Sequence, residues 1–555
     1  MLRFTPKIIS VLKEGYSFAK AYSDVLAGIT VAIVALPLAM ALGIASGASP
    51  GQGIITAIIA GFLISMLGGS RVQIGGPTGA FVVVVYGVIG RYGYDGLLLA
   101  TILAGFILIL AGYARLGQLI KFIPQPVITG FTSGIAVIIA STQLKNFLGL
   151  QFDNMQGSFV EKWRNYFSNF YDMEFAPISI GLMSLVTIFV FRKFIPWFPR
   201  YLIALIFASS VVVLFNLEVD TVGTRFSSIS IRNFTPIWPE ISLSKVQQVL
   251  PSAFIIAFLA GVEALLSAVV ADGMTGFKHR PNQELIGQGI ANCFSGLFGG
   301  IPATGAIART ATNIAAGGKT PFAGIFHSLF LLIFVLFAAD LIKFIPMSAL
   351  AAILFFVAWE MSEIHRFVRT MKFPGSDRVL LIMTFILTIF VDLSVAIGVG
   401  VTLASLLFVA HMAKSVEISS GIKESFGQNR KEENQREELP KGVEVFWIAG
   451  PIFFGMASDI PELLKQIGEN PKILIIRMRL VPFLYKTGAT AIADLVKQCG
   501  SRDIEVIFSA LKSQPESILL RWHEKLGWDH VSYSNSYKNA LVLAKEKIIS
   551  KEYAN

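Results

Sequence analysis

Charged residues are scarce in this chain. Only 15% of its 555 residues are Asp, Glu, Lys or Arg, against roughly a quarter in an average soluble protein. None occurs between Val25 and Ser70. Because a membrane span needs about 20 apolar residues, that stretch alone holds two. The composition excludes an ordinary soluble protein and predicts a polytopic α-helical membrane protein.

Cysteine and histidine are also rare. The two cysteines, Cys293 and Cys499, give no disulfide framework and no metal cluster, and the six histidines are scattered. No nucleophile–base pair stands out, which argues against a membrane enzyme. We therefore expect no metal and no cofactor. The basic N-terminal segment also lacks the small-residue cleavage site of a signal peptide.

Hydrophobic runs predict fourteen membrane spans. They lie near 25–45, 53–69, 77–90, 96–113, 124–141, 176–194, 201–216, 251–271, 285–298, 306–316, 322–341, 346–361, 377–393 and 394–412. Basic residues such as Arg71, Arg192 and Arg200 concentrate in the loops that a cytoplasmic N-terminus places inside. The net charge of +10 is therefore attributed to the positive-inside rule, not to nucleic-acid binding. We expect the protein to lie in the inner (plasma) membrane with both termini in the cytoplasm.

The spans contain an internal repeat. GQGI occurs at 51–54 and 287–290, and LIKFIP occurs at 119–124 and 341–346. PTGAF at 77–81 has a similar copy, PATGAI, at 302–307. The matches keep the same order. Seven crossings separate equivalent elements, so the two halves should lie in the membrane with opposite orientation. Repeat one is expected over 25–217 and repeat two over 251–413.

The composition changes after the last span. Residues 1–24 are expected to be a cytoplasmic segment, 25–413 the transport domain and 414–440 a charged linker. Beyond the linker, VEVFWIAG, KILIIRM and IEVIFSA are typical of short buried strands. Amphipathic helices are expected from TGATAIADLVKQC and PESILLRWHEKLG. Residues 441–555 therefore predict a small cytoplasmic α/β domain.

Two spans are broken at repeat-related positions. SRVQIGGPTGAFVVVVYGVIG leaves about 14 helical residues after Pro77, roughly 21 Å, too short for a bilayer core of about 30 Å. GIPATGAIARTATNIAAGG is shorter still. With Pro77 in a first turn, both segments are interpreted as half-helices that begin inside the membrane. Kinks with packing glycines are the alternative.

Half-helices in both repeats indicate a binding site of a transporter. Their starts would offer free N–H groups from Thr78–Phe81 and from Gly305–Ala308, and about half a positive charge each. Arg309 lies one turn into the second half-helix, in an uncharged run. The total of roughly +2 suits a dianion. The alternative is an arginine paired permanently with a protein carboxylate or with carbonyls.

Glu263 is the obvious carboxylate near this site. Ionised, it would lower the local charge to about +1, and protonated it would leave the site fit for a dianion. This predicts proton–anion symport, with Ser267 four residues on and on the same helix face. The alternative is a structural Glu263–Arg309 ion pair.

The chain resembles the SulP family of sulfate permeases and related anion exchangers. The resemblance rests on DVLAGITVAIVALPLAMA, GGPTGAF, AGVEALLSAVVADGMTG and AIARTATNIAAGGKT, and it looks closest to the bacterial DauA (YchM) branch, whose members carry C4-dicarboxylates such as succinate. It implies a seven-plus-seven inverted repeat, a mobile core domain moving against a gate domain, a homodimer and a C-terminal STAS domain.

The resemblance also implies site residues. The anion would lie between two segments, which comprise Gly76, Pro77, Thr78, Gly79, Ala80 and Phe81, and Gly305, Ala306, Ile307, Ala308 and Arg309. Glu263 falls where some relatives have a coupling carboxylate, and Ser267 where sodium-coupled carriers have a threonine. The longer Glu is interpreted as favouring protons over sodium. Ala308 replaces a serine that is frequent in animal relatives.

The STAS resemblance singles out Thr487. It occupies the position of a phosphorylatable hydroxyl in FLYKTGATAI, while Tyr485 replaces the family's Asp. An N-cap hydroxyl is the alternative to a phosphorylation site. A cytosolic protein partner at this domain is a further implication.

Several functions remain open at this point. Sulfate, bicarbonate and C4-dicarboxylates all satisfy the charge argument, and an exchanger or an anion channel would use the same site. A nucleobase–proton symporter of the same fold would have a carboxylate in the tenth span, where this chain has Arg309.

Overall fold

The structure is a computed structural model. It describes residues 4–118, 124–151, 159–195, 199–226, 235–372, 375–391, 393–414, 416–420, 439–453 and 471–553. The chain divides into two compact units, Met1–Thr402 and Leu403–Asn555.

The first unit is helical. Its elements are α1 (Lys7–Glu14), α2 (Phe18–Ala45), α3 (Pro50–Leu67), β1 (Gly75–Gly76), α4 (Phe81–Tyr113), α5 (Gln125–Leu148), α6 (Phe159–Ser168), the 3-10 helix η2 (Phe170–Asp172), α7 (Phe175–Phe194), α8 (Arg200–Leu214), α9 (Val222–Arg225), α10 (Leu243–Thr275), α11 (Pro281–Leu297), β2 (Thr304–Gly305), α12 (Ile307–Ala315), α13 (Pro321–Ile342), α14 (Met347–Met361), α15 (Ile364–Lys372) and α16 (Ser376–Phe390). Helix α17 (Leu393–Lys414) continues into the second unit.

The predicted spans correspond to these helices. Within the described residues, eight helices are long and apolar enough to cross a membrane, by length and composition. Helix α4 is broken by the non-helical backbone of Gly93, where the sequence predicted a boundary between two spans. Counted with this break, the described helices supply a segment at each of the fourteen expected positions. In the first copy of the repeated LIKFIP sequence, residues 119–123 lie outside the described residues.

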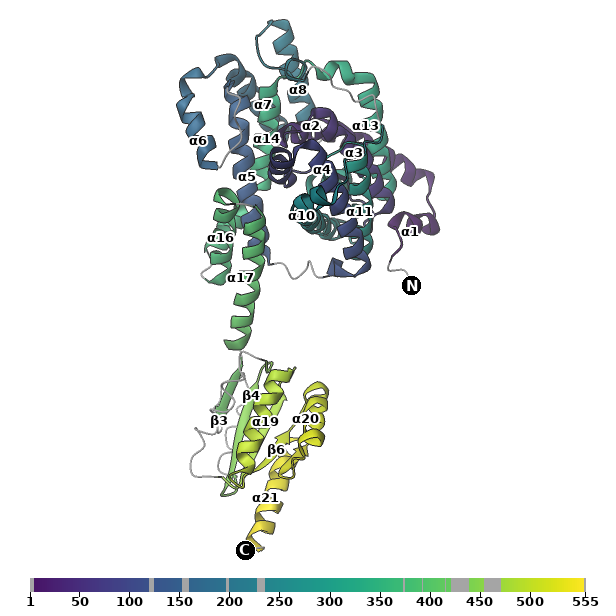
Figure 1. Cartoon of the computed structure of the whole chain (residues 1–555). Coiled ribbons are helices and arrows are strands. Elements are labelled where there is room, and N and C mark those ends of the chain that lie inside the picture. The colour runs from purple at the N-terminus through teal and green to yellow at the C-terminus, as the bar shows by residue number, and fades with distance from the viewer. Residues whose placement is uncertain are drawn as a thin grey trace. The chain divides into compact units, whose positions relative to one another are not determined.

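The helices of the first unit form two sets. In one set, α2 packs against α3 and α13, and α11 and α10 pack against α4. In the other, α14 packs against α5 and α7, α16 against α5, and α8 against α7. Figure 1 shows α5, α7 and α14 on one side of this unit and α10, α11 and α13 on the other. One large apolar core lines both sets.

Polar groups fix several helix starts. Ser49 and Gln52 form a reciprocal capping box at the start of α3, with Pro50 in its first turn. The buried carboxylate of Asp24 caps α13 from another helix, because it accepts hydrogen bonds from the amides of Lys319 (2.9 Å) and Thr320 (3.2 Å) and from the Thr320 hydroxyl. This bond set ties α2 to the start of α13.

The second unit has a five-stranded sheet of order β3-β4-β5-β6-β7. The strands β3 (Glu417–Ser420), β4 (Val443–Ala449), β5 (Ile473–Leu480), β6 (Glu505–Ser509) and β7 (Val531–Ser534) alternate with α19 (Lys486–Gly500), α20 (Ser513–Leu526) and α21 (Tyr537–Tyr553). Among the described strands of this sheet, β3 and β4 pair antiparallel and the other neighbours pair parallel. Two apolar cores cover the two faces of the sheet.

This second unit matches the strands and helices predicted after residue 440, with β3, β7 and α21 in addition. The stretch 414–440, expected to be a linker, contains β3, and its residues 421–438 lie outside the described part of the chain.

Candidate substrate-binding site

The two broken segments meet as a short antiparallel ribbon. Strand β1 pairs with β2 in the register Gly75–Gly305 and Gly76–Thr304. The amide of Ala306 also donates to the carbonyl of Ile74 at 2.8 Å. The extended backbone that precedes each half-helix is therefore paired with its counterpart from the other repeat, as backbone inside a membrane requires.

Glycines allow this ribbon to pack closely. A Cβ at Gly305 would lie 1.5 Å from Nε2 of Gln73, and one at Gly75 would lie 2.2 Å from the Ile64 side chain. Gln73 itself donates to the carbonyl of Ala264 in α10 at 2.9 Å. Gln73, which the sequence reasoning missed, therefore fixes the back of the ribbon.

The first half-helix begins later than predicted. Helix α4 begins at Phe81, so Pro77 lies in the extended lead-in and not in a first turn. The prediction that Pro77 opens the helix was wrong, because the chain first turns through Gly79 and Ala80. Helix α12 begins at Ile307, close to the predicted start.

Not all the expected amides are free. The amide of Phe81 donates to the carbonyl of Thr78 at 3.3 Å and that of Ala306 is used in the ribbon. Among the described residues, no hydrogen-bond acceptor is found for the amides of Thr78, Gly79, Ala80, Ile307 and Ala308. Each half-helix thus still presents unpaired N–H groups at its start.

The guanidinium of Arg309 crosses between the repeats. The side chain is 3% exposed, and Nη2 donates to the carbonyl of Pro77. The other terminal nitrogen, Nη1, is buried with no hydrogen-bond partner. In the part of the chain that the structure describes, no carboxylate lies within ion-pair distance of Arg309. The alternative of a Glu263–Arg309 pair is therefore not observed.

Glu263 instead contacts the first half-site. Its Oε2 accepts a hydrogen bond of 2.7 Å from the Thr78 hydroxyl. Ser267 does not join it, because its hydroxyl lies 3.3 Å from that of Thr310, which also accepts a bond from the amide of Ile74. The side chain of Ser267 is fully buried behind the ribbon.

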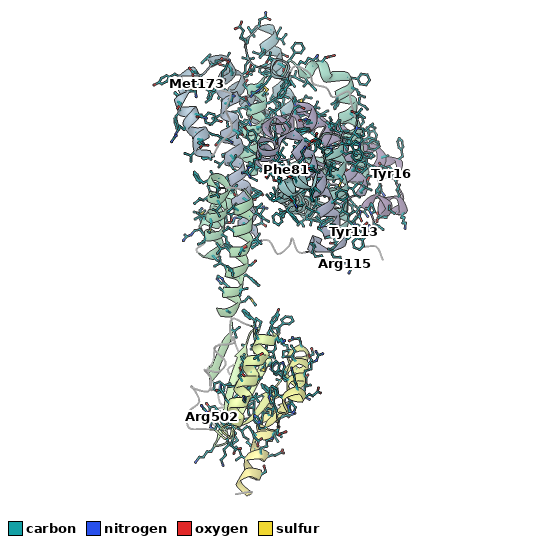
Figure 2. All side chains as sticks on the ribbon, viewed as in Figure 1. Tyr16, Phe81, Tyr113, Arg115, Met173 and Arg502 are labelled. Atoms are coloured by element: carbon teal, nitrogen blue, oxygen red, sulfur yellow. The ribbon has the colours of Figure 1, made fainter. Side chains whose placement is uncertain are left out.

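A cavity of about 630 Å³ opens onto both half-sites. The predicted site residues that line it are Pro77, Thr78, Gly79, Glu263, Gly305, Ala306, Ile307, Ala308 and Arg309. Gly76, Ala80, Phe81 and Ser267 do not line it. Phe81 is completely buried and lies among the packed helices in Figure 2. The sequence reasoning also missed the wall that α8, α14 and α15 supply, since no repeat or break marks those residues.

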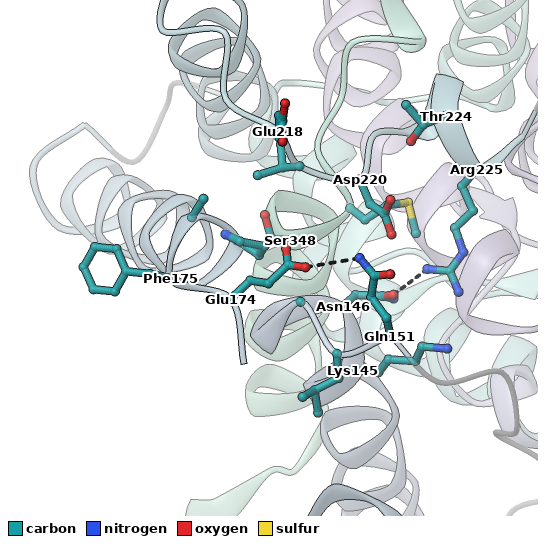
Figure 3. A pocket seen from close by; sticks show the side chains of 16 residues that line it. Lys145, Asn146, Gln151, Glu174, Phe175, Glu218, Asp220, Thr224, Arg225 and Ser348 are labelled. Carbon is teal, nitrogen blue, oxygen red and sulfur yellow. Dashed lines mark hydrogen bonds between the residues drawn. The ribbon is translucent and has the colours of Figure 1, made fainter. Parts of the chain in front are cut away.

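A second cavity, of about 640 Å³, lies at the other ends of two of these helices. Its lining includes Glu174 and Phe175 at the start of α7 and Ser348 at the start of α14, whereas the first cavity is lined by Arg192 and Met361 at the opposite ends. Figure 3 shows its side chains, with hydrogen bonds from Gln151 to Glu174 and from Arg225 to Asn146. At 1.5 Å per helical residue, the two cavities are separated by roughly 26 Å along α7.

Thr487 is not an N-cap. Tyr485 occupies the N-cap position of α19, and it makes no side-chain cap hydrogen bond. Thr487 is the second residue of the helix and is exposed. The N-cap interpretation was therefore wrong, while phosphorylation of Thr487 stays a prediction.

The family is decided by matches over most of the chain. A family model described as the sulfate permease family matches residues 22–384, and a STAS domain model matches residues 437–530. The chain belongs to the sulfate permease family. It is therefore an anion transporter with a helical membrane region and a C-terminal STAS domain, not an enzyme.

Two relatives illustrate the range of this sulfate permease family. The protein named "Putative sulfate transporter YvdB", from Bacillus subtilis (strain 168), is 38% identical over 93% of this chain and 97% of that protein. The bicarbonate transporter BicA of a Picosynechococcus species is 31% identical over 88% of each chain.

Solved structures give the fold. The structure of SLC26A9 has a TM-score of 0.85 at 18% identity and covers 100% of this chain and 94% of that chain, which shows the fold alone. The transmembrane domain of a cyanobacterial BicA has a TM-score of 0.61 at 29% identity and covers 70% of this chain and 98% of that chain. The predicted fold class agrees with these structures, and the expectation that the protein is a transporter and not an enzyme agrees with the family match. The DauA branch stays a prediction.

Proposed function

We propose that this transporter carries a small dianion, sulfate or a C4-dicarboxylate such as succinate, together with protons. The anion binds between the starts of α4 and α12. The observation that carries the proposal is the Nη1 atom of Arg309, which is buried, has no partner and belongs to a cavity-lining side chain. A buried guanidinium N–H without a partner is costly, and an anion oxygen would satisfy it.

Charge supports a dianion when Glu263 is protonated. Arg309 and the two helix starts supply roughly +2, and Glu263 lies on the same cavity at 2.7 Å from Thr78. Ionisation of Glu263 would lower the local charge to about +1 and weaken dianion binding. Protonation and anion binding are thus coupled through one site, with protons rather than sodium as the coupling ion.

Bicarbonate exchange is the second candidate. It is favoured by the 31% identity to a protein named as a bicarbonate transporter. A monoanion would suit the site with Glu263 ionised, without any coupled proton. A channel or a nucleobase symporter has less support, since Arg309 replaces the carboxylate that a nucleobase site would use.

The two cavities suggest how access alternates. We propose that the helix set holding β1, β2, α4 and α12 moves against the set holding α5, α7, α8 and α14, in an elevator-like motion. The protein would act as a homodimer in an inner (plasma) membrane, with both termini and the STAS domain in the cytoplasm. A cytosolic partner of the STAS domain and phosphorylation of Thr487 belong to this proposal.

Uptake into proteoliposomes tests the proposal. Labelled sulfate, succinate and bicarbonate are compared with and without an inward proton gradient. We expect gradient-stimulated uptake of a dianion, and loss of uptake in Arg309→Ala. The exposed Arg369→Ala in α15 is the matched control and should resemble the parent. Retained uptake in Arg309→Ala would remove the assigned role of Arg309, and gradient-independent bicarbonate uptake would favour the second candidate.

A further inference from the structure

Two arginines at the mouth of the first cavity contact the same aromatic ring. Arg192 comes from the last turn of α7 and Arg200 from the first turn of α8, and both line the cavity that contains Arg309. Their guanidinium carbons lie 5.1 Å and 5.2 Å from the centroid of the Phe356 ring in α14. Guanidinium groups at this distance from an aromatic face are held by cation–π attraction.

The ring that supports them is fixed. Phe356 is 1% exposed and packs edge-on against Tyr201 (centroids 6.0 Å apart) and Phe189 (5.3 Å). The Arg200 guanidinium also lies 4.9 Å from the Tyr201 ring. Both charges are therefore positioned by a packed aromatic cluster and not by flexible surface loops.

Among the described residues, a single carboxylate, that of Glu360, pairs with either of the two guanidiniums. Glu360, one turn after Phe356, lies 3.1 Å from Nη2 of Arg200 and also accepts a bond of 3.3 Å from the Tyr201 hydroxyl. Nε of Arg200 is buried without a partner. Within the described residues, Arg192 forms neither a hydrogen bond nor an ion pair. The other cavity-lining glutamate of this region, Glu363, is paired with Arg366 at 3.0 Å. The mouth thus carries an unneutralised positive charge.

We propose that Arg192 and Arg200 form a second anion site, which captures a small oxyanion before it reaches Arg309. A guanidinium binds carboxylate, sulfate or bicarbonate oxygens through paired N–H groups. Glu360 pairs with Arg200 in the absence of the anion, and the anion displaces it on binding. This inference rests on the proposed function for the class of ligand, an oxyanion, but not for its identity or its proton coupling.

The physical consequence is electrostatic concentration of substrate. A cation without a carboxylate partner, as Arg192 is among the described residues, raises the local concentration of anions, and salt screens the effect. By the positive-inside rule this mouth belongs to the cytoplasmic loops. The capture site would therefore act on the anion at the cytoplasmic entrance.

Initial-rate transport at low and at physiological ionic strength tests the capture site. Labelled sulfate, succinate and bicarbonate are measured in parallel, with release from the cytoplasmic side as the reaction. We expect Arg192→Ala to raise KM about threefold to tenfold at low salt, with Vmax unchanged and a weaker salt dependence. Lys193→Ala is the matched control, because Lys193 is the exposed neighbour that does not line the cavity.

Glu360→Gln should change KM in the opposite direction from Arg192→Ala. Removal of the internal carboxylate frees Arg200, so KM should fall, provided that the thermal midpoint of the variant equals that of the parent. Equal KM values for Arg192→Ala and Lys193→Ala, or a raised KM in stably folded Glu360→Gln, would overturn the inference. If the parent transported none of the three anions, the proposed function would be refuted instead, so the two failures are distinguishable.

Discussion

At the residue scale, the charge of one repeat is held by the backbone of the other. Nη2 of Arg309 donates to the carbonyl of Pro77, while Nη1 has no partner. A charged residue at a bilayer centre costs about 2.5–3.5 kcal/mol on insertion scales, and a single carbonyl offsets only part of that cost. An anion that binds Nη1 would offset the remainder, which explains why an arginine suits this position better than a neutral side chain.

Glu263 should set the pH dependence of transport. Because protonation raises the local positive charge, dianion uptake by the parent should increase as pH falls through the pKa of Glu263. Glu263→Gln mimics the protonated form, so its uptake should vary little with pH and should lose proton-driven accumulation. Uptake measured at a series of pH values, with Glu161→Gln outside the cavity as the control, checks this. A parent-like pH profile in Glu263→Gln would contradict the coupling role.

Gly305 should tolerate no side chain. A Cβ there would lie 1.5 Å from Nε2 of Gln73, so Gly305→Ala must push Gln73 away from its bond to Ala264 or separate the ribbon. We expect transport to be lost and the thermal midpoint in detergent to fall. Gly87→Ala, with nothing within 4 Å of the added Cβ, should behave as the parent. The double variant Gly305→Ala/Gln73→Ala should recover part of the activity; no recovery would place the clash elsewhere.

At the element scale, the membrane helices were the predictable part of the fold. Uncharged runs gave most boundaries to within a few residues, because hydrophobic length is set directly by the bilayer. The strands β4, β5 and β6 were also predictable, since each is a short run of buried β-branched residues. The repeat-related breaks at Gly75–Pro77 and at Pro302–Gly305 marked the extended backbone that precedes α4 and α12, because Gly and Pro interrupt an apolar helix.

Other elements carry no such signal. Strands β1 and β2 have two residues each, too few for a periodic pattern, so their pairing and the delayed start of α4 were not foreseen. The capture-site residues Arg192 and Arg200 looked like ordinary loop charges, because only the packing of Phe356 brings them together. The hydrogen-bond partners of Glu263 and Ser267 likewise depend on how helix α10 is rotated about its axis. A single i, i+4 spacing does not fix this rotation.

Helix α4 should depend on Gly93. Its backbone has φ 71° and ψ −179°, a region that is essentially restricted to glycine. Gly93→Ala should therefore cost on the order of 1–3 kcal/mol of stability and lower the thermal midpoint in detergent. Gly90→Ala, one turn earlier with ordinary φ and open space around the Cβ, is the control. Equal midpoints for the two variants would show that the break is not needed.

At the scale of the whole molecule, the two units have separate cores. The membrane unit has one large apolar core, while the STAS sheet has a core on each face. Helix α17 contains the boundary between them. Because each unit has its own buried clusters, we expect the two units to unfold in separate steps.

Cys499 can report the unfolding of the STAS unit. The thiol is fully buried, and burial raises the pKa of Cys499 to about 11, so the reactive thiolate is scarce at neutral pH. In a Cys293→Ser background, labelling should stay slow on heating until the STAS unit unfolds. Transport activity in samples cooled from just above that temperature should be retained. Labelling that begins only when the membrane unit melts would show one cooperative molecule.

The ribbon of β1 and β2 has a consequence for energetics. It joins the two half-sites by backbone hydrogen bonding, so the gap between the starts of α4 and α12 is set by this pairing and not by which side of the membrane is open. The intrinsic dissociation constant for the anion should therefore be the same whichever entrance is used. A carrier of this kind has no built-in direction: its net flux reverses whenever the gradients of anion and proton reverse.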